Sequence, residues 1–213
     1  MVVEQIITGG DRNFGYVIAD EASKDAALVD PSYDPGRLVQ WARDQGYRVR
    51  YILVTHDHED HTNGNAGARK LTGAPIVAHR LAETKADLRA DEGDELELGD
   101  LVIRVIHTPG HNPSHVCYLV GDAVFTGDTL FVGKVGGTDF GEGARQEYDS
   151  LHRKLMTLPG ETRVYPGHDV GLQPISTIDH ERRTNPFLRQ RSFEDFVNLK
   201  RNWQEYKRRH GIP

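Results

Sequence analysis

Apolar residues in the first quarter of the chain come in short runs that Gly, Asp and Lys separate. The runs at 2–8, 15–20 and 26–30 are rich in strand-forming residues and predict strands. The segment 35–46 begins with Pro, ends with Gly and spaces its apolar residues along one face, so it predicts a helix of about ten residues. The run at 50–55 is mostly apolar without alternation, which is typical of a strand covered on both faces.

The second half of the chain repeats this pattern. Residues 94–107 predict two strands around a Gly-Asp turn, and residues 114–128 predict a hairpin over a second Gly-Asp pair. A helix at 145–160 and a strand at 162–168 are expected to follow. Two sheets packed face to face, with helices outside, satisfy the pattern of both halves, so the expected fold class is α/β.

The tail is expected to form one more helix, at about 192–210. Ser192 and Asp195 have the spacing of a capping box, and the apolar residues of the tail lie on one helical face. We expect this helix to pack on the domain or on a second subunit, so a homodimer is one expectation. Because the sequence shows no linker or low-complexity segment, we expect residues 1–213 to form a single domain.

The composition narrows the class of protein. A net charge of −6 argues against a general nucleic-acid binder, which is usually basic. The sequence has no long apolar run and no basic region followed by an apolar one, so neither a membrane span nor a signal peptide is expected. Cys117 is the single cysteine, so an intrachain disulfide is impossible and a reducing cytoplasm is the simple inference.

The densest group of ionisable residues is THDHEDH at 55–61, directly after an apolar strand. His56 and His58 are two apart, so in an extended chain both imidazoles reach the same point. Asp60 and His61 follow as the chain turns into a helix and serve a second point nearby. Histidine and carboxylate ligands without a usable cysteine are typical of a catalytic Zn, Fe or Mn site.

Three more clusters stand just past apolar strands, namely HTPGH at 107–111, TGDTLF at 126–131 and YPGH at 165–168. Each combines Gly or Pro with one candidate ligand. A single cluster of this kind fits a solvated loop, but four of them at strand ends predict metal binding.

The motifs THDHEDH, TPGH, GDTLF and YPGHD, in this order, resemble the metallo-β-lactamase superfamily, and specifically its glyoxalase II-like branch. ALVDP before the first motif and ERRTNPFLR near the end resemble the same branch, so the resemblance covers nearly the whole chain. It implies a four-layer αβ/βα sandwich with metals in a cleft at the sheet edges.

The resemblance also implies roles for individual residues. The first metal would be held by His56, His58 and His111, and the second by Asp60, His61 and His168, with Asp128 bridging both. Asp30 matches a position that supports the ligands without binding metal. His107 and His115 match no ligand position and are expected to be structural.

The chemistry implied by the resemblance is hydrolysis of a small-molecule thioester. Two divalent metal ions, Zn or else Fe or Mn, would share a hydroxide and so supply a nucleophile without Ser or Cys. As candidate catalytic residues, Asp60 or Asp128 would help to orient that hydroxide. The chain has no Gly-x-Ser-x-Gly elbow, so serine nucleophilic catalysis has no support.

The expected substrate pocket departs from the glyoxalase II-like branch. Only residues 169–184 separate His168 from Asn185, so the helical region that contacts the glutathione peptide in that branch is missing. Gly137 stands where related enzymes usually have Arg. We therefore expect weak dependence on the glutathione peptide. Lys134 is a candidate partner for a substrate carboxylate, and its interpretation as a solvated loop lysine stays open.

Two alternatives to the hydrolase stay open. Segments at 86–100, 138–140 and 176–186 also resemble the persulfide dioxygenases, which use one iron and O₂ to oxidise glutathione persulfide. By that pattern a single Fe(II) would be held by His56, His111 and Asp128, a two-histidine, one-carboxylate set. The second alternative is a metal-stabilised binding module without turnover, in which the tail helix is the interaction element.

Overall fold

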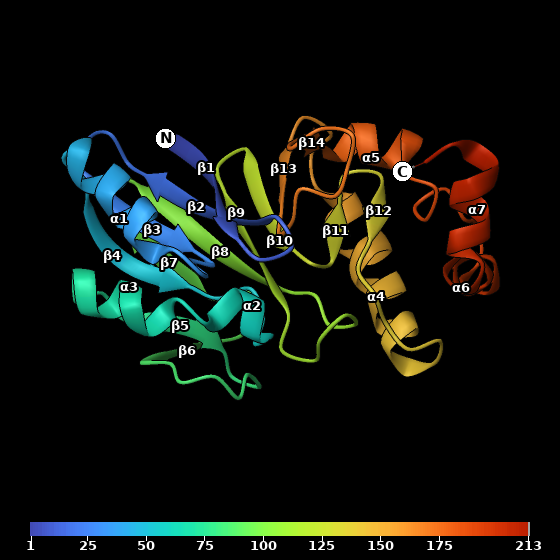
Figure 1. The fold of residues 1–213 in the computed structure, drawn as a ribbon, viewed down its shortest axis with the longest axis horizontal. Helices are drawn as coiled ribbons and strands as arrows, with labels where there is room; N and C mark the ends of the chain where they lie inside the picture. The colour runs from blue at the N-terminus through green and yellow to red at the C-terminus, as the bar shows by residue number, and fades with distance from the viewer. Residues whose placement is uncertain (213) are drawn as a thin grey trace.

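A computed structural model describes residues 1–212, and Figure 1 shows sheets in the middle of the molecule with helices on either side. The first sheet has the order β1-β2-β3-β4-β5-β6, formed by β1 (Val2–Gly9), β2 (Asn13–Ala19), β3 (Asp25–Val29), β4 (Arg48–Leu53), β5 (Ile76–His79) and β6 (Leu88–Ala90). The second has the order β14-β13-β10-β9-β8-β7, formed by β7 (Glu95–Leu98), β8 (Leu101–His107), β9 (Val116–Val120), β10 (Ala123–Gly127), β13 (Arg163–Pro166) and β14 (Ser176–Thr177).

The helices divide between the two halves of the chain. The first half contains α1 (Pro35–Asp44), α2 (Glu59–Thr62) and α3 (Asn65–Thr72). The second half contains α4 (Glu142–Arg153), the short 3₁₀ helix η1 (Leu155–Thr157), α5 (Ile178–Thr184), α6 (Phe193–Arg201) and α7 (Trp203–His210). A small separate hairpin pairs β11 (Leu130–Phe131) with β12 (Lys134–Val135).

Three apolar clusters define the layers. One lies between the two sheets and includes Tyr16, Leu53 and Phe125. A second joins the outer face of the first sheet to α1 and α3, and a third joins the outer face of the second sheet to α4, α5 and α6. The order is therefore helices, sheet, sheet, helices, which confirms the expected α/β sandwich.

Two parallel strand pairs decide where the functional side chains meet. β3 pairs with β4, and β10 pairs with β13, each in parallel, so the carboxyl ends of the two strands in each pair lie at one sheet edge. Backbone hydrogen bonds then join the two sheets at these ends, from Val116 N to Thr55 O and from Phe14 N to Gly167 O, both 2.8 Å long.

The tail differs from the single helix expected at 192–210. Helix α6 does begin at a Ser192 cap, because the Ser192 hydroxyl accepts from the Asp195 backbone N–H. The helix ends at Asn202, whose backbone lies outside the helical region at φ −104° and ψ 17°. The Asn202 side chain donates to the Asn198 carbonyl and so competes with the backbone for a helical acceptor. The tail therefore forms two helices, α6 and α7.

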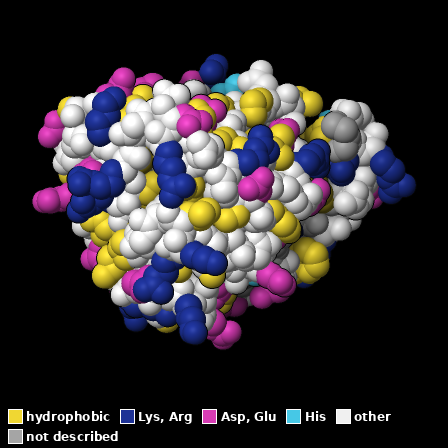
Figure 2. Space-filling model, turned by 60° about the vertical axis from the view of Figure 1, so that its left-hand side comes forward, with side chains coloured by type: hydrophobic (Ala, Val, Ile, Leu, Met, Phe, Trp, Pro, Cys, Tyr) yellow, Lys and Arg dark blue, Asp and Glu magenta, His cyan; other side chains and the backbone are white. Residues whose placement is uncertain are grey.

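The surface gives no sign of segregated charge on the face drawn in Figure 2, where basic and acidic side chains are interspersed with small apolar areas. Within residues 1–212, none of the helices has the length and apolar character needed to cross a bilayer.

The inter-sheet core makes a first prediction. The Phe125 ring is fully buried and stacks on Tyr165 with centroids 5.0 Å apart, so Phe125→Ala should lower the free energy of unfolding by about 3–5 kcal/mol. Chemical denaturation of the metal-free protein measures this loss. Phe140, which is 48% exposed, is the control, and Phe140→Ala should cost less than about 1 kcal/mol. Equal losses for the two variants would contradict the assignment of Phe125 to the core.

Candidate metal centre

The seven predicted ligands lie just past the carboxyl ends of strands that come from both sheets. The THDHEDH segment follows β4 and runs into α2, which begins after the extended residue His58. Asp128 directly follows β10, and His168 follows β13. His111 lies in the loop between β8 and β9. The hydrogen-bonded contact between strand ends of the two sheets therefore brings residues more than a hundred positions apart to one place.

The first group consists of three imidazoles. His58 Nδ1 lies 3.0 Å from His56 Nε2 and 3.1 Å from His111 Nε2. His56 is buried, His111 is partly exposed and His58 is exposed, so this group opens towards solvent. Two neutral imidazoles can share one N–H···N hydrogen bond. Three ring nitrogens that face one point cannot all be paired in this way, but a metal cation can bind all three.

The second group is more deeply buried. Its ligand atoms come from Asp60, His61 and His168, and His61 Nε2 lies 3.2 Å from His168 Nε2. Asp128 faces both groups, because its Oδ1 is 3.3 Å from His61 Nε2 and its Oδ2 is 3.6 Å from His111 Nε2. The structure thus brings all seven predicted side chains together, with Asp128 between the two groups as expected of a bridging carboxylate.

Partners outside the centre fix which nitrogen of each imidazole faces inward. Nδ1 of His111 donates to the Gly137 carbonyl at 2.7 Å, and Nδ1 of His168 donates to the Asp11 carbonyl at 2.9 Å. A carbonyl oxygen only accepts, so each ring holds its proton on Nδ1 and turns the lone pair of Nε2 inward. Both histidines are therefore prepared as metal ligands.

Asp30 fixes the remaining two Nε2 atoms in the same way. Its carboxylate accepts from His61 Nδ1 at 2.8 Å and from the Thr55 hydroxyl at 2.6 Å. Because the Thr55 hydroxyl has donated its one proton, it accepts from His56 Nδ1, 3.1 Å away. His56 and His61 also present lone pairs to the centre, which gives Asp30 the supporting role that its position in ALVDP predicts.

The pKa shifts of the side chains in the centre also indicate a site that favours positive charge. Burial opposes charge on His168, but hydrogen bonds to Asp128 and Asp60 outweigh it and raise the pKa of His168 to about 10. Burial also works to raise the pKa of Asp128, yet the neighbouring His61 and His168 hold it well below its usual range. Oδ1 of Asp128 is buried without a hydrogen bond among the described residues. A proton on His168 Nε2 supplies that positive charge when no metal is bound, and a cation that replaces it would find inward lone pairs and ionised carboxylates, a donor set that suits divalent zinc or iron.

Comparison with known proteins agrees with this geometry. The model of the metallo-beta-lactamase superfamily matches residues 8–168, which contain all seven ligands. The chain belongs to this superfamily. It is 37% identical over 207 residues to human mitochondrial persulfide dioxygenase ETHE1, covering 95% of this chain and 81% of that protein. It is also 37% identical over 177 residues to the hydroxyacylglutathione hydrolase of Polaromonas sp., covering 79% of this chain and 67% of that one.

A solved structure of the superfamily is similar over nearly the whole chain. The crystal structure of ETHE1 from Myxococcus xanthus superposes with a TM-score of 0.89 at 38% identity, covering 95% of this chain and 91% of that one. Relatives of both predicted branches, the persulfide dioxygenases and the hydroxyacylglutathione hydrolases, are therefore present, as the sequence motifs indicate.

Some residues of this superfamily site escape the motif analysis. His115, expected to be structural, accepts from the Asp128 backbone N–H with its Nε2 at 3.0 Å and so holds the backbone of Asp128 in place. Asn13 donates to the Asp60 carboxylate at 3.0 Å. A Cβ at Gly167 would lie 2.4 Å from Asp128 Oδ1, so glycine lets the chain just after β13 approach Asp128 that closely. These contacts depend on tertiary structure, and only the GH pair of YPGH pointed towards one of them.

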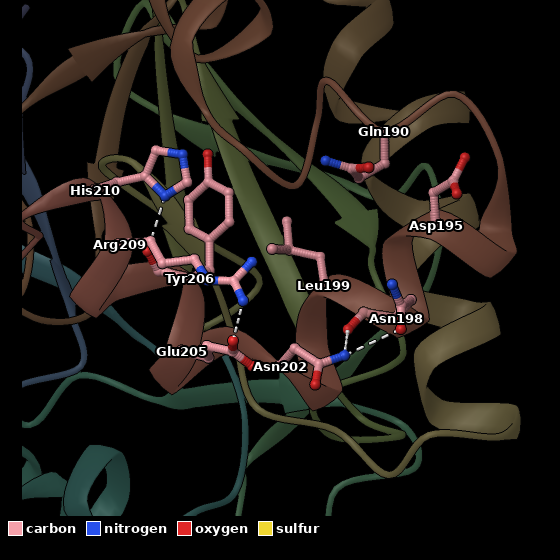
Figure 3. Close-up of a pocket in the computed structure, with 9 residues that line it drawn as sticks. All are labelled: Gln190, Asp195, Asn198, Leu199, Asn202, Glu205, Tyr206, Arg209 and His210. Atoms are coloured by element: carbon pink, nitrogen blue, oxygen red, sulfur yellow. Dashed lines mark hydrogen bonds and ion pairs between the residues drawn. The ribbon is translucent and has the colours of Figure 1, made fainter.

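Two hollows lie near the C-terminal part of this superfamily domain. One, of about 640 Å³, is lined by Arg12, Lys134, His180 and Trp203 among others, and also by Asp11, whose carbonyl accepts from His168 Nδ1. The other, of about 460 Å³, lies along α6 and α7, and Figure 3 shows only side chains of residues 190–210 around it. Lys134 therefore lines the first hollow, and none of the seven candidate metal ligands lines either one.

The support given by Asp30 makes a second prediction. Asp30→Asn keeps the size of the side chain and suits its positive φ of 44°, but it removes the charge and an acceptor for Thr55 and His61. Affinity for Zn²⁺ should fall about 10–100-fold, measured by competition with a chromogenic chelator. Asp34→Asn is the matched control, because Asp34 caps α1 and asparagine caps almost equally well. An Asp30→Asn variant with unchanged affinity would remove Asp30 from the metal-binding machinery.

Proposed function

We propose that the chain is a persulfide dioxygenase acting on the persulfide of a small thiol. The reaction is R–S–SH + O₂ + H₂O → R–SH + H₂SO₃. The outer sulfur loses four electrons and becomes sulfite, O₂ gains them, and the S–S bond breaks to release the thiol. Sequence motifs alone favour a thioester hydrolase, but the comparisons give more support to the persulfide dioxygenase.

The extent of the similarity carries the proposal. The match to human ETHE1 covers 95% of this chain, so it must reach through α6, whereas the match to the hydroxyacylglutathione hydrolase covers 79%. A sequence match that extends into the tail is expected if the tail contributes to the metal centre in both proteins. Lys200 of α6 does lie against the loop that holds His111, because its Nζ donates to the Gly136 carbonyl at 2.7 Å.

The residues proposed to hold iron are His56, His111 and Asp128. Two imidazoles and one carboxylate suit Fe(II), which when bound supplies the site where O₂ is activated. The surrounding residues orient these three side chains. Thr55 and the Gly137 carbonyl orient the two imidazoles, and His115 holds the backbone of Asp128. The partly exposed side of this group admits the persulfide.

The hollow beside the centre supports a thiol carrier with carboxylates. Arg12 and Lys134 line it, and Lys134 also lies 5.0 Å from the centroid of the Phe131 ring. Cationic side chains at the wall of a pocket attract a carboxylate and orient the reacting end of the ligand towards the metal. A persulfide of glutathione or of cysteine carries such a group.

The second candidate is the thioester hydrolase. The observation that favours it is the complete second group of Asp60, His61 and His168, because two metals are needed to share a hydroxide. In that reaction Asp60 or Asp128 would orient the hydroxide. The resemblance to persulfide dioxygenases includes these residues too, so the choice between the reactions requires activity measurements.

The reaction test uses Fe(II)-loaded and Zn(II)-loaded protein side by side. Fe(II)-loaded protein should consume O₂ with glutathione persulfide and release one sulfite for each O₂, while Asp128→Ala should lose at least about a hundredfold in rate. An oxygen electrode measures the O₂ consumed, and a sulfite assay measures the sulfite released. Absence of O₂ uptake, together with hydrolysis of lactoylglutathione by a dinuclear preparation, would overturn the dioxygenase and establish the hydrolase.

Lys134 gives a further prediction about the substrate. If its ammonium pairs with a carboxylate of glutathione persulfide, Lys134→Ala should raise KM about tenfold, equivalent to about 1.4 kcal/mol, with little change in kcat. Lys24→Ala is the control, because Lys24 lies over Tyr47, away from the pocket. A parental KM for Lys134→Ala would assign this lysine to structure rather than to substrate binding.

A further inference from the structure

A charged pair is buried between two helices of the second half. Lys200 of α6 contacts Glu147 of α4, and their side chains are 6% and 0% exposed. Burial raises the pKa of Glu147 to about 7 although Lys200 lies beside it. Removing two charges from water often costs more than their attraction returns, so two apolar side chains would pack this contact at least as well. A role in packing alone does not account for the pair.

The second contact of Lys200 leads towards the metal centre. Its Nζ donates to the Gly136 carbonyl at 2.7 Å, and the next carbonyl, that of Gly137, accepts from His111 Nδ1 at 2.7 Å. A Cβ at Gly136 would lie 2.0 Å from the Asp128 carbonyl oxygen and 3.1 Å from His111 Nδ1. This segment of the loop is therefore held between Lys200 on one side and two candidate ligands on the other.

Glu147 reaches the same histidine from another direction. The residue before His111 is Gly110, with φ of +144°, and a Cβ there would lie 2.4–2.5 Å from Glu147 N, Cα and Cβ. Helix α4 thus packs directly on the backbone that leads into His111. One buried ion pair connects the loop that orients the His111 ring with the helix that supports its backbone.

We propose that Lys200 is a positioning residue for the metal centre, and that Glu147 keeps its ammonium group in place. Lys200 Nζ fixes the Gly136–Gly137 segment, so that the Gly137 carbonyl holds the His111 proton on Nδ1 and directs Nε2 at the metal. The tail helix α6 then forms part of the site, 89 positions after His111 in the chain. The proposal rests on the metal centre of the proposed function and not on the reaction that it performs.

The test replaces the pair by apolar residues of similar size. Lys200→Met with Glu147→Leu should leave the thermal midpoint of the metal-free protein within a few degrees of the parent, because no charge remains buried. Its affinity for Zn²⁺, measured by chelator competition, should nevertheless fall about 10–100-fold. The visible spectrum of the Co²⁺ form should change as well, because the His111 ligand is no longer held. Glu147→Gln, whose amide oxygen can still accept from Lys200 Nζ and so keep the bond from Lys200 to Gly136, should lose less than about threefold in affinity.

Two further variants make the result decisive. Glu205→Leu with Arg209→Met removes an exposed ion pair from α7 and should leave both metal affinity and spectrum unchanged. Lys200→Met alone, at pH 6.5, repeats the test with Glu147 protonated, should the double variant fail to fold. Parental affinity and a parental Co²⁺ spectrum in either folded Lys200 variant would overturn the proposal and leave the pair as a packing contact. Because neither measurement uses turnover, failure of the dioxygenase reaction would not affect the result.

Discussion

The carboxylate of Asp30 determines the direction of the hydrogen bonds behind the metal centre. It is 2% exposed, and a buried carboxylate is tolerated only when donors surround it. Three donors do so, namely the Thr55 backbone N–H, the Thr55 hydroxyl and His61 Nδ1. Since a carboxylate only accepts, each of these protons is committed, and the lone pairs of His56 and His61 are left to face inward.

That interaction depends in turn on the pairing of the strands. The parallel contact of β3 with β4 brings Asp30 beside Thr55, and the Asp30 backbone N–H donates to the Leu53 carbonyl at 3.0 Å. The parallel contact of β10 with β13 does the same for Asp128 and His168. Each sheet thus supplies part of the ligand set, and the bond from Val116 N to Thr55 O fixes one part relative to the other. The centre is a property of the two-sheet architecture rather than of any one loop.

The sequence predicts most of this because ligands and strand ends are local patterns. THDHEDH after an apolar strand, and single ligands beside Gly or Pro in three later clusters, identify all seven side chains that converge. The short strand β6 and the hairpin of β11 and β12 were not predicted, since two or three residues carry no periodicity. The break at Asn202 was also missed, because the apolar face of the tail continues across it.

The supporting residues were harder to predict for a different reason. Asp30 was found because ALVDP resembles a family motif, but Asn13, Thr55 and Lys200 act through contacts between segments distant in sequence. A lysine in a basic tail looks like a solvated residue until its burial is known. Such residues are identified by asking what each buried polar group is bonded to.

The two ligand groups differ in how they meet solvent, and this difference bears on the chemistry. His61 and His168 are buried, whereas His58 is exposed and His111 partly so. A ligand arriving from solvent therefore meets the first group before the second. The first group is also the one in which the orientation of a ligand, His111, depends on a glycine-containing loop, through the Gly137 carbonyl. A reactive centre at the exposed end of the cluster needs such a loop to be held from outside, and in this protein the tail helix is placed to hold it.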